Sequence, residues 1–151
     1  MQEEQFSSKK QQRLNKIKEN IQEAGFGELA ENMIVEPKDA PKMSKILQEF
    51  VSPYIDPVYT LKQRKSLFGL AAIAWNAAVM PTSEIDTFLE KELSKQDTET
   101  QQEVKKLIDE LIARKYKYFS DIKYFIMDVQ VTETKRQYHI SVASTLLSNP
   151  E

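Results

Sequence analysis

The apolar stretch LFGLAAIAWNAAVM, residues 67–80, decides which fold this sequence can adopt. Apart from Gly69 and Asn76, every side chain in the stretch is apolar, and it carries Trp75, the one tryptophan of the chain. A helix that is apolar on every side has no face to offer to water, so it belongs in the interior of a protein. We therefore predict that this stretch forms the central buried helix of the fold, with Trp75 in the core.

The flanking residues mark both ends of this helix. Thr60 and Gln63 have the spacing of a capping box, in which each side chain bonds the backbone N–H of the other residue. Pro81 lacks a backbone donor and ends the helix, which therefore covers about residues 61–80. Within it, the amide of Asn76 must find hydrogen-bond partners. We expect a backbone contact that sets the register of the helix, and a ligand contact is the alternative.

Further helices are predicted on both sides of the central one, because apolar residues recur there at spacings of three and four. These helices cover about residues 7–24, 39–52, 83–93 and 97–118. The candidate caps at their amino ends are Asp39, Thr82 or Ser83, and Asp97 or Thr98. Gly25 and Gly27 follow the first helix, as glycines past a helix end commonly do.

The pattern changes near residue 124, where apolar and polar side chains begin to alternate. The apolar positions are Phe125, Met127, Val129 and Val131, and later Tyr138, Ile140 and Val142. A period of two with β-branched and aromatic residues predicts strands, and the polar segment 132–137 can turn the chain between them. We predict a C-terminal β-hairpin over about residues 124–145, with the first set of apolar residues on one face.

These elements predict an α+β, predominantly α-helical protein, with about five helices packed around the central buried helix (about 61–80) and the hairpin at the end. Residues 1–6 are expected to be disordered and residues 7–151 to form a single domain, a size that can bury a core without covalent staples. Segment 28–38 contains apolar residues without a clear period and stays unassigned.

Composition limits the chemistry and the location of the protein. The chain has no cysteine, which excludes disulfides, thiolate catalysis and zinc sites built on sulfur. Its net charge of −2 gives no general attraction to nucleic acid or to anionic membranes. The apolar stretch is shorter than the roughly 20 residues of a membrane-spanning helix, and the polar amino end lacks the pattern of a signal peptide. We expect a cytoplasmic protein without membrane contact.

Residues that could carry catalysis are few. His139 is the one histidine and is expected to be an ordinary strand residue, since neither a nucleophile elbow nor a phosphate-binding glycine loop is present. The acidic residues concentrated in segment 84–103 lack EF-hand spacing and are expected to form a solvated helix face. Gly69 is expected to permit the close approach of another helix. The sequence therefore predicts no catalytic residue, cofactor or metal site.

A cluster of basic and aromatic residues at 114–119 gives a nucleic-acid hypothesis. Arg114, Lys115 and Lys117 interleave with aromatic residues there, and such a pattern can hold a single strand by charge and stacking. Basic side chains near the carboxyl end of a helix also interact favourably with its dipole, which needs no ligand. Nucleic-acid binding is therefore an alternative rather than the leading hypothesis.

The first predicted helix has a narrow apolar seam formed by Leu14, Ile17 and Ile21, which can pack on its own domain or on another chain. Because no catalytic motif is present, we expect a non-enzymatic protein–protein interaction or accessory module. It would bind a protein partner or a second copy through this helix or through the hairpin edge. The alternatives are a nucleic-acid-associated protein that uses residues 114–119 and a carboxylate-based hydrolase, which would need acidic residues paired in a pocket.

Overall fold

The computed structural model describes residues 2–34, 42–135 and 137–148, with their side chains except those of residues 2–8 and 10. The described elements are α1 (Gln2–Glu23), α2 (Gly27–Glu31), β1 (Met33–Ile34), α3 (Met43–Val51), α4 (Leu61–Val79), α5 (Thr82–Leu93), α6 (Thr98–Tyr118), β2 (Tyr124–Thr134) and β3 (Gln137–Leu147). The α+β, predominantly α-helical fold is confirmed, and so is the C-terminal hairpin. The short elements α2 and β1 lie in the segment that the sequence left unassigned.

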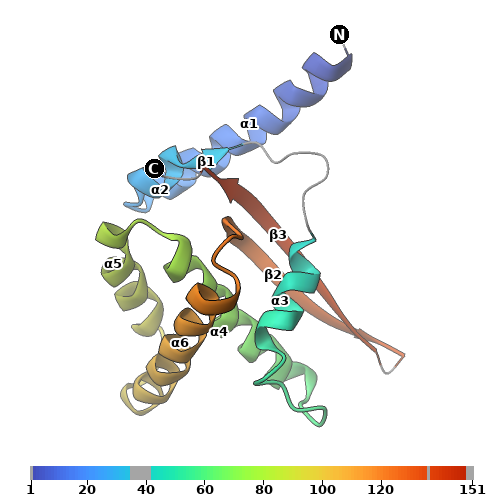
Figure 1. Ribbon diagram of the computed structural model, residues 1–151, viewed down its shortest axis with the longest axis vertical. Coiled ribbons are helices and arrows are strands. Elements are labelled where there is room, and N and C mark those ends of the chain that lie inside the picture. Colours follow the sequence, from blue (N-terminus) through green and yellow to red (C-terminus); the bar gives the residue numbers. More distant parts are fainter. Residues whose placement is uncertain (1, 35–41, 136, 149–151) are drawn as a thin grey trace.

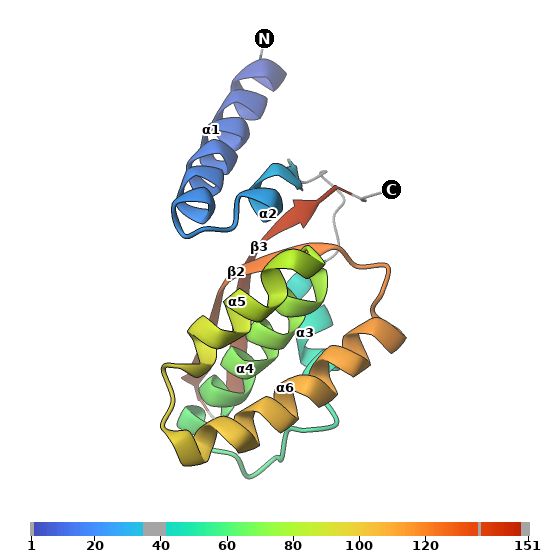
Figure 2. The same ribbon diagram turned by 90° about the vertical axis from the view of Figure 1, so that its left-hand side faces the viewer.

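Helix α4 is the central element. It packs against α3, α5, α6 and β2, and the two views show these elements gathered around it (Figure 1, Figure 2). The predicted capping box is present: the N–H of Thr60 donates to Gln63 Oε1 (2.8 Å), and the N–H of Gln63 donates to Thr60 Oγ1 (3.2 Å). The helix ends at Val79, before Pro81. The prediction of a central buried helix is confirmed at both ends.

Two consecutive residues of α4 fasten it to the outer edge of β2. Trp75 Nε1 donates to the carbonyl of Tyr124 (2.7 Å). Asn76 Nδ2 donates to the carbonyl of Ile126 (2.9 Å), and the N–H of Ile126 donates to Asn76 Oδ1 (2.7 Å). The Asn76 amide thereby makes the pair of hydrogen bonds that a neighbouring strand would make. The predicted backbone contact of Asn76 is confirmed.

We expect Asn76→Ala to lower the free energy of unfolding by about 2 kcal/mol, because the buried N–H and carbonyl of Ile126 would each lose a partner. Denaturant unfolding followed by circular dichroism measures the loss. Ser66→Ala, at an exposed position of the same helix, is the control and should change the stability by less than about 0.5 kcal/mol. A loss for Asn76→Ala no larger than that of the control would contradict the role of this amide.

The three strands form an antiparallel sheet in the order β1-β3-β2. The single apolar face predicted for β2 is wrong, because the register shifts between Ile126 and Asp128. Phe125 packs in a core cluster with residues of α1 and α2, whereas Val131 packs in the main cluster around α4. A bulge adds one residue to one strand, so the side chains that follow change face relative to the simple alternation.

Helices α1 and α2 lie at one end of the hairpin, and the amino end of α1 points away from the other elements (Figure 1). Helix α1 ends in a Schellman motif, in which the N–H of Phe26 donates to the carbonyl of Ile21 (3.0 Å) and that of Gly25 to the carbonyl of Gln22 (3.0 Å). Gly25 has a φ of +98°, which a residue without Cβ adopts readily. The predicted helix stop at Gly25 is confirmed.

Two of the other predicted caps can be compared with the structure. The carboxylate of Asp97 accepts a hydrogen bond from the N–H of Thr100 (2.8 Å), as predicted, and side-chain and backbone hydrogen bonds of Thr100 lower the pKa of Asp97. Neither Thr82 nor Ser83 caps α5, so that prediction is wrong. The N-cap is Pro81, which makes no side-chain cap bond, because the chain enters α5 directly from the proline corner.

The boundaries near the amino end differ from the predicted ones. Helix α1 begins at Gln2 rather than near residue 7, and α3 begins at Met43. The predicted cap Asp39 lies outside the described residues. The division into a disordered segment 1–6 and a single domain 7–151 stays a prediction.

Candidate functional site

The residues predicted to bind a partner lie against the protein's own core. Leu14 of α1 is 5% exposed and belongs to the core cluster that also contains Phe26 and Leu29. Ile17 and Ile21 are half-buried and pack against the same cluster. The seam of α1 therefore packs within the chain, and binding of a partner through these residues stays a prediction.

Arg114, a residue of the predicted nucleic-acid cluster, holds two helices together. Its Nε donates to the carbonyl of Phe50 (2.9 Å) and its Nη2 to the carbonyl of Glu49 (3.0 Å). Both carbonyls lie in the last turn of α3, where backbone acceptors lack the usual helix donors four residues on. The Glu49 carbonyl also accepts hydrogen bonds from the N–H (3.3 Å) and Oγ (2.8 Å) of Ser52. Arg114 thus caps α3 from α6, and its guanidinium is half-buried by this contact.

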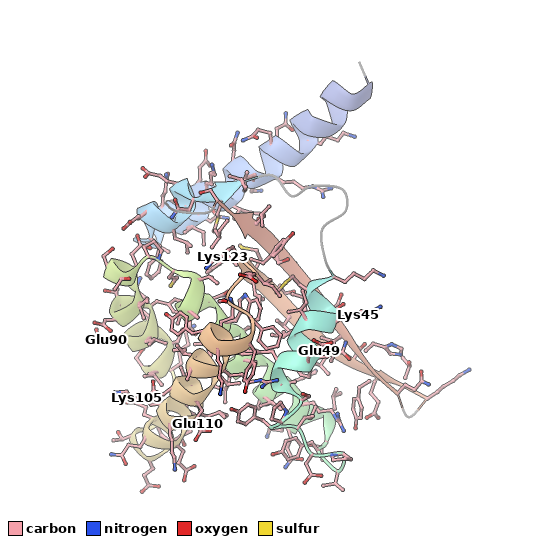
Figure 3. All side chains as sticks on the ribbon, in the orientation of Figure 1. Lys45, Glu49, Glu90, Lys105, Glu110 and Lys123 are labelled. Atoms are coloured by element: carbon pink, nitrogen blue, oxygen red, sulfur yellow. The ribbon has the colours of Figure 1, made fainter. Side chains whose placement is uncertain are left out.

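Lys115 points into the core. Its side chain is 2% exposed, and Nζ donates to the carbonyls of Phe119 (2.5 Å) and Ile122 (2.9 Å). The ammonium also lies 4.4 Å from the ring centroid of Trp75. Burial, with a smaller contribution from the charge of Lys123, lowers the pKa of Lys115 to about 8. Lys123 is in the connection between α6 and β2, where Figure 3 labels it.

The predicted basic cluster is therefore not brought together on one surface. Arg114 and Lys115 are bound to backbone carbonyls, and Lys117 is the exposed member of the three. Their positions near helix ends agree with the interpretation that needs no ligand. Nucleic-acid binding stays a prediction, and no contact of these residues favours it.

The acidic residues of segment 84–103 do not converge. Among the described residues, no three histidine or carboxylate side chains come close enough to share a metal ion. Glu90 on α5, and Lys105 and Glu110 on α6, are exposed on the outer side of their helices (Figure 3). His139 is exposed on β3 and shares a hydrogen bond with Thr134 Oγ1 (2.7 Å). These positions give no support to the hydrolase hypothesis.

A groove of about 400 Å³ lies between α4 and the outer edge of β2. We call it the edge groove, and its lining residues are Lys65, Gly69, Val129, Gln130, Val131 and Thr132. Strand β2 is an edge strand of the sheet, with β3 on one side. In the described part of the chain, no backbone hydrogen bond joins residues 127–134 to any segment other than β3.

Gly69 does not have the role that its sequence context predicted. A Cβ built at this position would meet no atom of another element within 4 Å, so no helix approaches closely there. The prediction of close helix packing is wrong because Gly69 faces the edge groove. Glycine inside a helix costs about 1 kcal/mol relative to alanine, and at Gly69 no packing contact offsets that cost.

One face of α4 covers the edge of β2 at Asn76 and leaves it uncovered at Gly69. Lys65, Gly69 and Asn76 recur at spacings that place them on one side of the helix. At Asn76, a side-chain amide occupies the hydrogen-bonding groups of Ile126. At Gly69, two turns and roughly 10 Å earlier, no side chain reaches the strand. The groove is thus the part of the strand edge that α4 leaves uncovered.

Val129 and Val131 carry the backbone groups that this groove exposes. They pack against the same core cluster as Ile126 and so share its face of the sheet. Along an antiparallel strand, the direction of the N–H and carbonyl groups alternates together with the side-chain face. We therefore infer that the N–H and carbonyl groups of Val129 and Val131 point outward, as those of Ile126 do.

The sequence predicts the hairpin edge as a possible interface but assigns to it none of the residues that line the groove. The signal that could have found them was Gly69, whose helix-weakening effect has no local explanation. The sequence does not show which element Gly69 faces, since that depends on the crossing of α4 and β2.

Comparison of the chain with protein-family models, with curated proteins and with solved structures finds no match in any of the three. Among the described residues, none of the helices combines the length and the apolar character that a membrane span requires.

Proposed function

We propose that the protein is an interaction module that binds an extended segment of a partner protein in the edge groove. The segment would add a strand to the sheet and pair with the outward backbone groups of Val129 and Val131. The observation that carries the proposal is Gly69, which holds the groove open at a cost in helix stability. Strand addition to a sheet edge is a recurrent mode of peptide recognition, with main-chain hydrogen bonds supplying affinity.

The shape of the site favours a lone extended chain over a second copy of this protein. Helix α4 packs against β2 and contacts its outer edge at Asn76, so a strand beside residues 129–132 would lie next to the helix. A second copy that paired through its own β2 would bring its own α4 into the same space. The groove borders on residues 129–132, which span roughly 13 Å of strand, so about four residues of a partner would fit.

Substitutions at Gly69 test the proposal because they separate binding from folding. We expect Gly69→Ala to raise the free energy of unfolding by about 1 kcal/mol, since the added methyl group meets open space. Gly69→Gln should fold equally well, because glutamine is a good helix former. Its longer side chain should fill the groove and weaken segment binding by about tenfold or more.

The experiment uses random heptapeptides displayed on phage, selected on the full chain and then synthesised. Amide chemical shifts locate the bound peptide, and the proposal expects the largest changes at Val129 and Val131. Ser66→Gln, which introduces the same side chain at an exposed position outside the groove lining, is the matched control. Selection of no peptide, or binding that Gly69→Gln leaves unchanged, would contradict the proposal. A dimer that Gly69→Gln dissociates would instead identify a second copy as the occupant.

A further inference from the structure

We propose that the segment bound in the edge groove is acidic, with a carboxylate placed beside Lys65. This inference rests on the proposed function and gives the chemical class of the partner. Lys65 lines the groove one turn before Gly69 and is exposed. Within the described ranges, no carboxylate lies at salt-bridge distance from its ammonium, and no hydrogen bond holds it.

Lys65 differs in this respect from four basic side chains whose charges the fold itself engages. Four other basic side chains donate to backbone carbonyls and thereby join elements or cap helix ends; they are Arg64, Lys91, Arg114 and Lys115. Their charges are engaged by the fold itself. The charge of Lys65 has no such use, and it lies at a groove that borders on an open strand edge.

The strand side of the groove is neutral, which favours a carboxylate at one position only. Gln130 and Thr132 line it without charge. The nearest acidic residues in sequence, Asp128 and Glu133, lie outside the lining and flank it along the strand. Asp128 is also engaged, because its Oδ2 accepts a hydrogen bond from Gln130 Nε2 (3.2 Å). A carboxylate is thus attracted beside Lys65 and repelled beside Asp128 and Glu133, which restricts the register of the segment.

The attraction has to be local, because the protein as a whole is acidic. A net charge of −2 gives no general preference for acidic peptides. Enrichment of acidic residues in selected peptides would therefore report on the groove and not on the overall field. Interactions between exposed charges are screened by salt, so the preference should weaken as ionic strength rises.

Charge reversal at two lysines of α4 tests the inference on the full chain. Lys65→Glu and Lys62→Glu change the net charge equally, and both lysines are exposed on the first half of the helix. Lys62 does not line the groove and serves as the matched control. With an acidic peptide from the phage selection, Lys65→Glu should weaken binding about tenfold, and Lys62→Glu by less than about twofold. A peptide in which the glutamate that meets Lys65 is replaced by lysine should bind the Lys65→Glu variant better than it binds the unchanged protein.

Three results would overturn the inference. They are selected peptides without acidic enrichment, equal effects of the two charge reversals, and failure of the lysine peptide to recover binding to Lys65→Glu. If the selected peptides remain sensitive to Gly69→Gln in any of these cases, the proposed function stands without the acidic partner. Absence of any peptide sensitive to Gly69→Gln would remove the proposed function and, with it, the acidic partner.

Discussion

Trp75→Ala is expected to lower the free energy of unfolding by about 4 kcal/mol, the middle of the range for truncation of a buried aromatic side chain. Trp75 has no exposed surface. Its ring packs edge-on against Phe50, with centroids 5.2 Å apart, and against Phe119 at 5.8 Å. Truncation would leave a cavity where α3, α4 and the end of α6 meet, and would also remove the donor to the Tyr124 carbonyl.

Two variants give this measurement its controls. Trp75→Phe keeps an aromatic ring but loses the indole N–H, so its loss should be smaller, about 2 kcal/mol. Tyr116→Ala removes an aromatic side chain that is 55% exposed and should cost less than about 1 kcal/mol. Circular dichroism follows the unfolding, because the chain has no second tryptophan for fluorescence. A loss for Trp75→Ala equal to that for Tyr116→Ala would contradict its place at the centre of the core.

The stability of the protein is expected to rise with pH between about 8 and 10.5 because of Lys115. Its pKa is about 8 in the folded protein and 10.5 for an ordinary lysine. In this interval the unfolded chain binds more protons than the folded one, so raising the pH favours folding. The difference between the two pKa values corresponds to a change of at most about 3 kcal/mol in the free energy of unfolding. This contribution of Lys115 to the free energy of unfolding is complete above pH 10.5 and is lost as the pH falls through 8.

A comparison of variants isolates the contribution of Lys115 from the rest of the chain. The free energy of unfolding is measured from pH 7 to 10.5 for the unchanged protein and for Lys115→Met, whose side chain cannot titrate. As the pH rises over this interval, the free energy of unfolding of the unchanged protein should increase by about 3 kcal/mol relative to that of Lys115→Met. Lys117→Met, at an exposed position, should give no such shift. A constant difference for Lys115→Met would mean that the two carbonyls and the Trp75 ring fully offset the cost of burying the charge.

The prediction of α4 succeeded because its signals are local. A capping box joins residues three positions apart, and a proline ends a helix by its own geometry, whatever surrounds it. The burial of Trp75 and Asn76 followed from an apolar composition that leaves no face for water. The backbone contact of Asn76 was predicted in kind, but its partner, Ile126, is fifty positions away in the chain.

Predictions that depended on contacts between distant elements were the ones that failed. The bulge in β2 could not be read from an alternating pattern, because Met127 continues that pattern and only pairing with β3 shows the extra residue. The groups that surround Lys115 come from α4 and from the connection that follows α6. The local sequence of basic and aromatic residues is the same whether the aromatic rings bury the basic side chain or leave it in water. The burial of Lys115 could therefore not be predicted from that pattern.

The sequence by itself determined the helical class, the central helix with both its ends, and the C-terminal hairpin, because hydrophobic period, capping and proline geometry act over a few residues. The tertiary structure alone decided what those elements leave exposed. It placed the α1 seam and Lys115 inside the protein, and it left Gly69 and Lys65 beside an open strand edge. Exposure depends on how elements cross and on which side chains fill the space between them, and no local pattern specifies either.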